Sequence, residues 1–496
     1  MKRAFCTCLA AFVMLVMLSP AGNARPLYRI EELEFAFPSG GPDMNDLGQI
    51  AFSDGGNLYL WLPEPAYSLP AGLNFLQGPL PGDWQPKARA VNNKGQVVGE
   101  LFLGGTIRPF PGADTFLWLP EPAYGMDAGM HSLALFWTGD VNDTGQVAGG
   151  CCGPTGTWQA AVWLPEPAYG LAKGLHYLSA DRFSSASGIN NRGQAIGSDL
   201  NGVFLWLPEP AYGLPGGLHT IAQAEPDSSC QPRKVNDAGE VAGYRAVWDM
   251  DAQTCRVSPF LWLPKATHGL PEGFNLLDVS LQGSEGNLGV RASVSINNAG
   301  RMAGTLSAYP GIPPIVVPEP IVGSQGYQWV VDKLSFIWEQ GTAWNPLEVL
   351  DSTGEGWTDV YPEVINNHGQ IIGRGTHDGR YCTFLLTPVL TAIDIKPGDP
   401  DNCINLRSKG VTPVAILTTE DGDAGDVEVS TVRFAGAAPV RWSMKDVNHD
   451  RDMDLVCLFR TQDLSLDASS TTATLTGRLN NRNYIDAVDS VRVLAP

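Results

Sequence analysis

The stretch Phe-Leu-Trp-Leu-Pro-Glu-Pro-Ala-Tyr-Gly-Leu-Pro-Gly-Gly-Leu-His, residues 204–219, recurs along the chain and decides its fold. Close copies begin at residues 116 and 161, looser copies at 59 and 260, and degraded copies at 336 and 384. Self-similarity at a nearly constant spacing is typical of proteins built from stacked repeats. Any domain assignment must therefore begin with this repeat.

A second motif, Asn-x-x-Gly, lies between successive copies of the first. Its seven copies begin at Asn45, Asn92, Asn142, Asn190, Asn236, Asn297 and Asn366. Asn at the first position bonds its own backbone, and Gly at the fourth takes the left-handed conformation, so the motif predicts a tight turn. Repeated Asn and Asp could also be metal ligands, but a turn alone accounts for the whole pattern.

Each repeat predicts four short strands. In the second repeat they lie near Leu73–Leu76, Ala88–Asn92, Gly95–Leu101 and Thr115–Leu119. In the last of these, Phe116 and Trp118 point to one face and Leu117 to the other. The recurring Trp could be a sugar platform, but a large aromatic more often fills the space between packed sheets. The Leu-Pro-Glu-Pro-Ala-Tyr-Gly segment is a rigid connector, because proline cannot occupy a central strand.

Four strands in each 40–50 residues is the signature of a β-propeller blade. We therefore expect an all-β protein whose residues 25–389 form a seven-bladed β-propeller of four-stranded blades. The seven first strands begin at Tyr28-Arg29-Ile30. The sequence leaves open where each blade begins, because ring closure often mixes strands from the two termini.

The hairpin Asn-x-x-Gly-Gln-Val-Val-Gly followed by a Phe-Leu-Trp strand resembles the HAF repeat of bacterial extracellular proteins, over roughly residues 28–388. The His-Ala-Phe that names the family is missing. Its place holds Asp114-Thr115-Phe116, Gly202-Val203-Phe204 or Ser258-Pro259-Phe260. The resemblance implies export and a propeller-like fold, and it brings no catalytic residues.

Residues 390–496 form a different unit, which reads as a β-sandwich with strands such as Thr412–Leu417, Val427–Phe434 and Asp454–Arg460. The stretches Ile393–Gly398 and Ser408–Leu417 resemble a C-terminal module that recurs in secreted bacterial proteins. The resemblance implies no particular activity.

The loop 446–454 of this unit predicts a structural calcium ion. The expected ligands are Asp446, Asn448, Asp450, Asp452 and Asp454, with Asp452 offering its carbonyl oxygen. The spacing resembles the calcium loops of dockerin and integrin-type repeats. However, Arg451 stands where a Gly normally makes the turn, and Cys457 stands where a bidentate Glu is usual. A solvated acidic turn is the alternative.

The first 24 residues have the pattern of a signal peptide. Lys2 and Arg3 precede the apolar run Phe5–Leu18, and small residues lead to a cleavage site after Ala24. The run is short for a membrane span, and no later segment is apolar enough to cross a bilayer. We therefore expect a protein exported to the cell surface or the extracellular space.

The formal net charge of −20 argues against nucleic acid and against anionic membranes as partners. Seven cysteines remain beyond residue 24, and none has zinc-site spacing. In an oxidising compartment some should pair, and Cys403–Cys457 is the expected disulfide.

The sequence contains no esterase elbow, no zinc-protease motif and no phosphate loop. His131, His176 and His219 occupy the same repeat position, which favours a structural role. The fifth repeat departs from the others: it carries an insertion bounded by Cys230 and Cys255, and has Lys265 and His268 where other copies have Glu and Tyr. The sixth adds Ser307–Asp332.

Two functions remain open. The first is a non-catalytic secreted protein whose propeller presents a binding surface to an extracellular protein or polysaccharide. The second is a polysaccharide-degrading hydrolase or lyase with its site in the central cleft, for which Lys265 and His268 are weak catalytic candidates. A non-repeating cluster of carboxylates or histidines in the centre would favour the enzyme.

Overall fold

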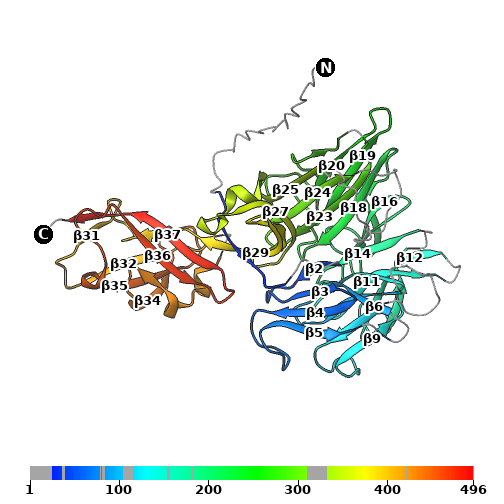
Figure 1. The fold of residues 1–496 in the computed structure, drawn as a ribbon, viewed down its shortest axis with the longest axis horizontal. Coiled ribbons are helices and arrows are strands. Elements are labelled where there is room, and N and C mark those ends of the chain that lie inside the picture. The colour runs from blue at the N-terminus through cyan, green and yellow to red at the C-terminus, as the bar shows by residue number, and fades with distance from the viewer. Residues whose placement is uncertain are drawn as a thin grey trace, which may run out of the picture.

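The computed structural model describes residues 25–35, 40–78, 80, 84–103, 115–153, 157–179, 183–284, 286–309, 332–419 and 422–494. Over these ranges the chain forms 38 strands and five short 3-10 helices, and it has no α-helix there. The protein is therefore all-β (Figure 1). No helix in the described part is long and apolar enough to cross a membrane. The signal peptide and most of the sixth-repeat insertion lie outside the described residues.

Successive antiparallel sheets make up residues 40–390, one for each repeat, and five of these sheets have four strands. The first two are β2 (Gly40–Met44), β3 (Ile50–Asp54), β4 (Asn57–Leu62), β5 (Gly72–Gln77), and β6 (Trp84–Val91), β7 (Val97–Leu103), β8 (Thr115–Leu119), β9 (Gly129–Leu133). The third and fourth are β10 (Trp137–Val141), β11 (Val147–Cys152), β12 (Trp158–Leu164), β13 (Gly174–Tyr177), and β14 (Ser185–Ile189), β15 (Ala195–Asp199), β16 (Gly202–Leu207), β17 (Gly217–Gln223).

The fifth and sixth sheets contain longer strands. The fifth has β18 (Ser228–Val235), β19 (Val241–Asp249), β20 (Thr254–Leu263) and β21 (Gly273–Leu276), with β22 (Leu281–Gln282) added to β20. The sixth has β23 (Gly289–Ile296), β24 (Met302–Tyr309), β25 (Asp332–Glu339) and β26 (Thr342–Trp344). After the 3-10 turns η1 (Pro346–Val349) and η2 (Ser352–Gly354), the last sheet has β27 (Trp357–Ile365), β28 (Ile371–His377) and β29 (Arg380–Leu390).

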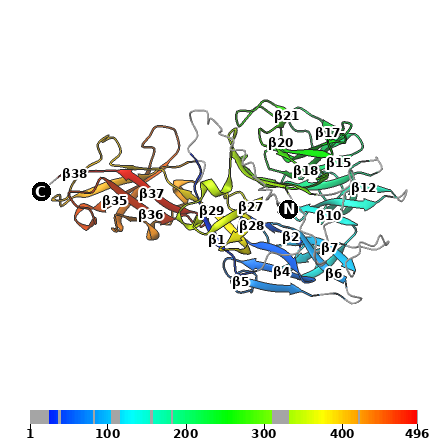
Figure 2. The same cartoon turned by 45° about the horizontal axis from the view of Figure 1, so that its top comes forward.

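The sheets are arranged like the blades of a propeller around a common centre (Figure 2). Each packs on the next, and β2 of the first sheet contacts β27 and β28 of the last. Strand β8 was expected as the last strand of its repeat but is third in its sheet, because the expected first strand, Leu73–Leu76, is β5 of the first sheet. The predicted facing of β8 is confirmed: Phe116 and Trp118 lie in a core shared with the first sheet, and Leu117 lies in the core shared with the third sheet. The repeated Trp therefore fills the space between sheets.

The chain's first strand, β1 (Tyr28–Glu32), completes the last sheet. It pairs antiparallel with β29, Tyr28 opposite Pro388 and Glu32 opposite Phe384. The sequence left open which strand begins each sheet; the structure places Tyr28-Arg29-Ile30 in the last sheet and begins the first sheet with β2. The last repeat supplies only three strands, and pairing with β1 covers the outer edge that β29 would otherwise expose.

The Pro-rich connector ends in a two-residue reverse turn. Ala211 and Leu214 exchange two backbone hydrogen bonds of 3.1 and 2.8 Å, and the residues between them, Tyr212 and Gly213, have φ angles of 55° and 74°. Two positive φ angles define the type I′ turn, which a Tyr tolerates only at a cost. This places the Tyr212 ring against Gly239 of the next sheet, where a Cβ would lie 2.1 Å from the Tyr hydroxyl.

Residues 393–494 form two facing sheets around one core. One holds β30 (Ile393–Ile395), β32 (Val411–Ile416), β35 (Asp454–Arg460) and β34 (Pro439–Lys445). The other holds β33 (Arg433–Phe434), β36 (Thr472–Arg478) and β37 (Tyr484–Ser490), and the short pair β31 (Cys403–Asn405) and β38 (Arg492–Leu494) lies apart. Three further 3-10 turns are η3 (Ala424–Asp426), η4 (Val429–Thr431) and η5 (Thr461–Asp463). The strand expected at Val427–Phe434 is therefore interrupted by η4 and reduced to the two residues of β33.

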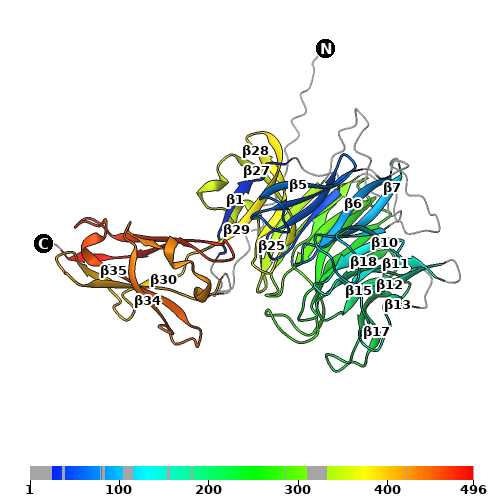
Figure 3. The ribbon, with the colours of Figure 1, turned by 90° about the horizontal axis from the view of Figure 1, so that it is seen from below.

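This C-terminal unit extends from the side of the last propeller sheet (Figure 3). The end of β29 continues into it and pairs in parallel with β37, Val389 opposite Tyr484. The Arg29 guanidinium lies 4.2 Å from the centre of the Tyr484 ring, and the Tyr484 hydroxyl donates to Glu31 over 2.7 Å. Strand β1 therefore helps to hold both units together.

The expected Cys403–Cys457 disulfide is not formed in the structure, where all seven cysteines of the described residues are free thiols. Cys457 points from β35 into the core and is fully buried, whereas Cys403 lies on β31, which pairs with β38 in a separate small sheet. Burial raises the pKa of the Cys457 thiol to about 11, which makes it an unreactive thiol.

Candidate functional site at the propeller axis

The Asn that opens each Asn-x-x-Gly turn also links its sheet to the next. Its side-chain amide donates to the main-chain carbonyl of the corresponding Asn one repeat later, as from Asn45 to Asn92 over 2.8 Å. The series continues through Asn92, Asn142, Asn190, Asn236 and Asn297 to Asn366. Asn366 then donates to the carbonyl of Asn45, so the seven hydrogen bonds form a closed ring.

The same side chain also organises its own turn. In the fourth repeat, the Asn190 carbonyl oxygen accepts from the backbone amides of Arg192 and Gln194 at 3.1 and 3.0 Å. Its amide also donates to the Gln194 side chain over 2.8 Å. Every hydrogen-bonding group of this buried Asn is therefore used, as buried polar groups require.

A second closed ring uses the residue that follows each of these Asn. The backbone amide of each such residue donates to the side-chain oxygen of the equivalent residue one repeat later. In the first repeat, the Asp46 amide donates to the Asn93 side chain over 2.8 Å. The members are Asp46, Asn93, Asp143, Asn191, Asp237, Asn298 and Asn367, and the last returns to Asp46. The two rings fix the inner turns of all the sheets relative to one another.

The rings surround a cavity of about 100 Å³ at the axis. Lys234 lines it, together with the ring residues and the apolar ends of the inner strands. The position two residues before each ring Asn does not repeat. It is occupied in order by Asp43, Ala90, Asp140, Gly188, Lys234, Ser295 and Val364.

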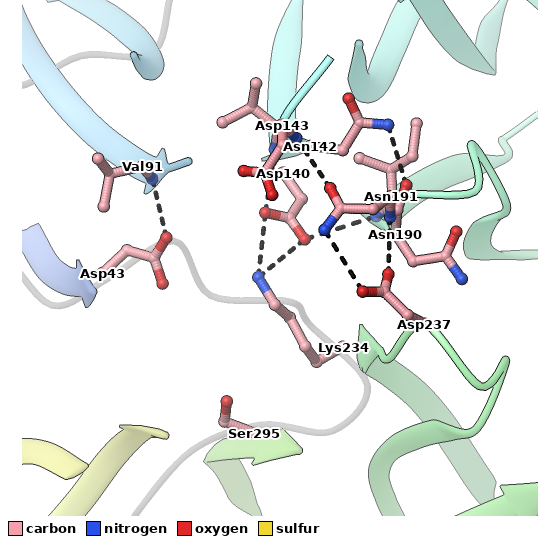
Figure 4. A network of polar contacts seen from close by, with 12 residues as sticks. Asp43, Val91, Asp140, Asn142, Asp143, Asn190, Asn191, Lys234, Asp237 and Ser295 are labelled. Carbon is pink, nitrogen blue, oxygen red and sulfur yellow. Dashed lines mark hydrogen bonds and ion pairs between the residues drawn. The ribbon is translucent and has the colours of Figure 1, made fainter. Parts of the chain in front are cut away.

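Three of these non-repeating residues are charged and lie together (Figure 4). The Lys234 ammonium group binds both carboxylate oxygens of Asp140, at 3.1 and 3.0 Å. Asp43 accepts from the backbone amide of Val91 over 2.8 Å. Asp43 and Asp140 are 8% and 4% exposed, whereas about a third of the Lys234 side chain is exposed (32%). Sequence analysis missed this trio, although aligning the repeats on their Asn would have shown it.

Burial dominates the electrostatics of the trio. It raises the pKa of Asp43 to about 6, and the nearby Asp140 carboxylate acts in the same direction, while Lys234 partly offsets both. For Lys234, burial favours the neutral amine, but the Asp140 and Asp43 carboxylates outweigh it and raise its pKa above the usual value. Two carboxylates therefore share one ammonium, and Asp43 is the one that gains a proton in mild acid.

The cavity is too small for a substrate pocket. Sites that enclose small organic ligands span roughly 300–1,000 Å³, and a liquid water molecule occupies about 30 Å³. A volume near 100 Å³ holds a few waters beside Lys234. The charged groups of the trio therefore interact mainly with one another, and Lys234 offsets the charge of Asp140.

The two catalytic candidates from the sequence lie elsewhere. Lys265 is exposed on the fifth connector. His268 takes the place of the connector Tyr: its Nε2 lies 2.9 Å from a Glu240 carboxylate oxygen, and a Cβ on Gly300 would lie 2.2 Å from its ring. His268 thus serves the same packing contact as Tyr212, and the structure does not bring the two candidates together.

The three repeated histidines make the same backbone contact. The Nε2 atoms of His131, His176 and His219 lie 2.7–2.8 Å from the backbone carbonyl oxygen four residues earlier. In the first and fifth repeats the equivalent residues Asn74 and Asn275 donate to the same position, both over 2.9 Å. At this repeat position the Asn side-chain amide makes the same contact as the His imidazole. The contact therefore does not require an ionisable side chain.

The predicted calcium ligands lie in the loop between β34 and β35. Asp446 accepts from the backbone amides of His449 and Arg451, and Asp454 accepts from those of Val447 and Thr418. The Arg451 φ of 86° is that of the missing Gly. In this conformation both oxygens of the fully buried Asp454 accept backbone hydrogen bonds, and the described residues include no group of three His, Cys, Asp or Glu side chains placed to hold a metal ion.

No family model matches the chain, and no curated protein matches it either. Among solved structures, the chain resembles one described as "Crystal Structure of Mitotic Checkpoint Complex", with a TM-score of 0.34 and 11% identity over 77% of this chain and 98% of that one. Prolyl oligopeptidase B from Galerina marginata gives a TM-score of 0.30 and 8% identity over 54% and 38% of the two chains. PorZ of Porphyromonas gingivalis gives 0.18 and 10% identity over 91% and 81%. Scores this low carry no argument about function, so the site must be interpreted from its own chemistry.

Proposed function

We propose that residues 25–389 form a seven-bladed β-propeller of the HAF-repeat type, followed by a β-sandwich at 390–496, in a protein exported by its first 24 residues. Two observations support the blade count. The Asn ring returns to its starting residue after seven hydrogen bonds, and β1 completes the last sheet.

The function best supported is that of a secreted, non-catalytic repeat protein whose propeller presents a binding surface to an extracellular protein or polysaccharide. This proposal rests on the finding that the repeated polar side chains bind other parts of the same chain and are not left to bind a substrate. The ring Asn residues, the repeated His and the connector Tyr are all engaged in internal hydrogen bonds or packing. Apart from the axial trio, the departures from the repeat lie at the outer hairpins, and such departures usually carry function.

Screening the secreted chain against arrays of extracellular polysaccharides and proteins tests this proposal. We expect a ligand whose binding is unchanged by Asp43→Asn, a substitution in the axial trio. Loss of all binding in this variant, with the fold intact by circular dichroism, would place the function at the axis instead.

One observation favours the alternative, a polysaccharide hydrolase or lyase. Asp43, whose pKa is raised to about 6, and Asp140 are two carboxylates in different environments, as glycosidases require. The cavity of about 100 Å³ argues against it, because a sugar ring cannot enter beside Lys234. Turnover of any polysaccharide that is lost in Asp43→Asn would establish the enzyme.

A further inference from the structure

The hairpin β19–β20 of the fifth sheet is longer than its neighbour β15–β16 in the fourth. In the fourth sheet, Gly197 faces Phe204 and the strand ends two residues later at Asp199. In the fifth, Gly243 faces Phe260 in the same way, but the strand continues for six residues to Asp249. At about 3.3 Å per residue, the fifth hairpin projects roughly 13 Å beyond the fourth.

One face of this projection is covered and the other is open. Ala246, Cys255 and Val257 are buried in a core shared with Leu306 and Ala308 of the sixth sheet. The alternate residues face the shorter fourth sheet, and there Val247 remains 39% exposed. The step between a short sheet and a long one thus leaves a groove.

The groove has a volume of about 390 Å³, within the range of small-ligand sites. Its lining residues share one face of the sheet: Arg245, Val247, Asp249, Thr254, Arg256, Ser258, Leu276 and Gln282. Cross-strand pairing sets Arg245 opposite Ser258 and Val247 opposite Arg256. The two arginines are therefore diagonal neighbours, whose Cα atoms lie about 7–8 Å apart in such a pairing.

The two guanidinium groups differ in what they can offer to a ligand. Arg245 forms an ion pair with Glu225, and its Nε, although it has no partner, is too buried for a ligand to reach. The Nε of Arg256 donates to the Gln282 side chain over 3.2 Å, and Arg256 has no ion pair among the described residues. A planar guanidinium is well matched to a carboxylate, which it binds through two parallel hydrogen bonds.

We infer that this groove binds a carboxylate-bearing sugar unit of an acidic polysaccharide. Arg256 receives the carboxylate. Thr254, Ser258 and Gln282 offer hydroxyl and amide groups for sugar hydroxyls, and the exposed Val247 and Leu276 offer an apolar surface to the ring. The inference rests on the proposed binding function and gives it a site and a ligand class.

An acidic peptide fits less well. Extended peptides gain affinity by adding a strand to an open sheet edge, where backbone groups are unpaired. The groove lies on the face of a sheet whose strands β19 and β20 are both paired on each side. Only side chains are available to a ligand here, which favours a compact molecule with many hydroxyl groups.

Calorimetry on the full chain tests the assignment with a linear trimer of galacturonic acid and the corresponding neutral trimer of galactose. We expect the acidic trimer to bind at least tenfold more tightly, and more weakly as salt rises. Arg256→Gln keeps the polar side chain without its charge and should reduce affinity at least tenfold. Arg192→Gln, an exposed arginine on an inner turn, is the matched control and should bind as the wild type.

Wild-type affinity in Arg256→Gln, or equal binding of the two trimers, would overturn the groove while leaving the proposed surface role standing. A hexaglutamate peptide that binds through Arg256 when the acidic trimer does not would overturn the sugar assignment. Wild-type protein that binds neither trimer, yet binds another partner on the arrays, would also reject the groove and retain the wider proposal.

Discussion

The side-chain amide of Asn366 donates to the main-chain carbonyl of Asn45 over 3.1 Å, across 321 residues of sequence. Six equivalent bonds link the remaining repeats, so the last repeat is joined to the first through the centre as well as through β1. Each bond is buried, and a lost buried partner costs more than an exposed one.

Replacing one ring Asn should destabilise the whole propeller. In Asn190→Ala, the backbone amides of Arg192 and Gln194 and the Asn236 carbonyl lose their partner. We expect unfolding to become easier by about 2–4 kcal/mol, measured by urea denaturation. Arg192→Ala in the same turn should change stability by less than about 0.5 kcal/mol. Equal effects of the two substitutions would contradict a structural ring.

Substitutions at two glycines can separate the cost of backbone strain from the cost of a steric clash. Gly239→Ala and Gly213→Ala both place a Cβ at positive φ, 84° and 74°. Only at Gly239 would the Cβ meet Tyr212, since nothing lies within 4 Å of it at Gly213. We expect Gly213→Ala to cost about 1 kcal/mol and Gly239→Ala at least about 2 kcal/mol more.

Adding Tyr212→Ala tests the contact directly. If the Tyr hydroxyl causes the clash, Gly239→Ala should cost much less in the Tyr212→Ala background. Additive effects in the double-mutant cycle, measured by thermal and urea unfolding, would show that Tyr212 and Gly239 are not coupled.

Stability should depend on pH through Asp43. Its pKa is about 6 in the folded protein and about 3.9 in an unfolded chain, so the folded state binds this proton more tightly. The contribution is fully present below pH 4 and is lost as pH rises through 6, by roughly 2–3 kcal/mol. Asp43→Asn should remove this slope and be more stable than the wild type at pH 7.

The control is Asp140→Asn, which leaves Lys234 without the carboxylate that binds it. This variant should be less stable than the wild type at pH 7, because Lys234 loses the carboxylate to which it is hydrogen-bonded and keeps only the nearby charge of Asp43. Melting temperatures recorded from pH 4 to pH 8 give both comparisons. If the melting temperature of the wild type depended on pH in the same way as that of Asp43→Asn, Asp43 would not be the source of the pH dependence.

The calcium prediction for loop 446–454 can be checked on the full chain. Extracellular sites of this kind bind at roughly 10⁻⁴–10⁻³ M. With a dissociation constant near 1 mM, about 10 mM calcium would stabilise the folded form by about 1.4 kcal/mol. The shift should vanish in the double variant Asp446→Ala, Asp450→Ala and should not occur with magnesium. No calcium-dependent shift would leave the loop as an acidic turn.

The sequence predicted best what is local and repeated. The Asn-x-x-Gly turns form as expected, with Gly193 at a φ of 74°, because both residues act within a single turn. The side to which Trp118 points followed from strand alternation. The bond from Asn190 to Asn236 was missed, because turn chemistry already explained the Asn and hid its second role.

Features that depend on distant segments could not be predicted in the same way. Strand β1 has no local signal that assigns it to β29, because either end of the propeller could accept it. The trio at the axis needs three repeats to converge on one point, and the 3-10 turn at Val429–Thr431 interrupts the strand expected at Val427–Phe434. The groove could have been found from the unequal hairpin lengths of the fourth and fifth repeats.

The pairing of β1 with β29 sets an order of events during synthesis. Residues 28–32 are made near the start of the chain, yet their partners at 384–388 appear about 350 residues later. At 5–20 residues per second, the first strand waits roughly 20–70 s for its partner to be made. During that interval the opening segment is an unpaired strand that can associate with other chains. The last sheet can therefore be completed only after nearly four-fifths of the chain has been made. Until then, residues 28–32 must be kept from pairing with other chains.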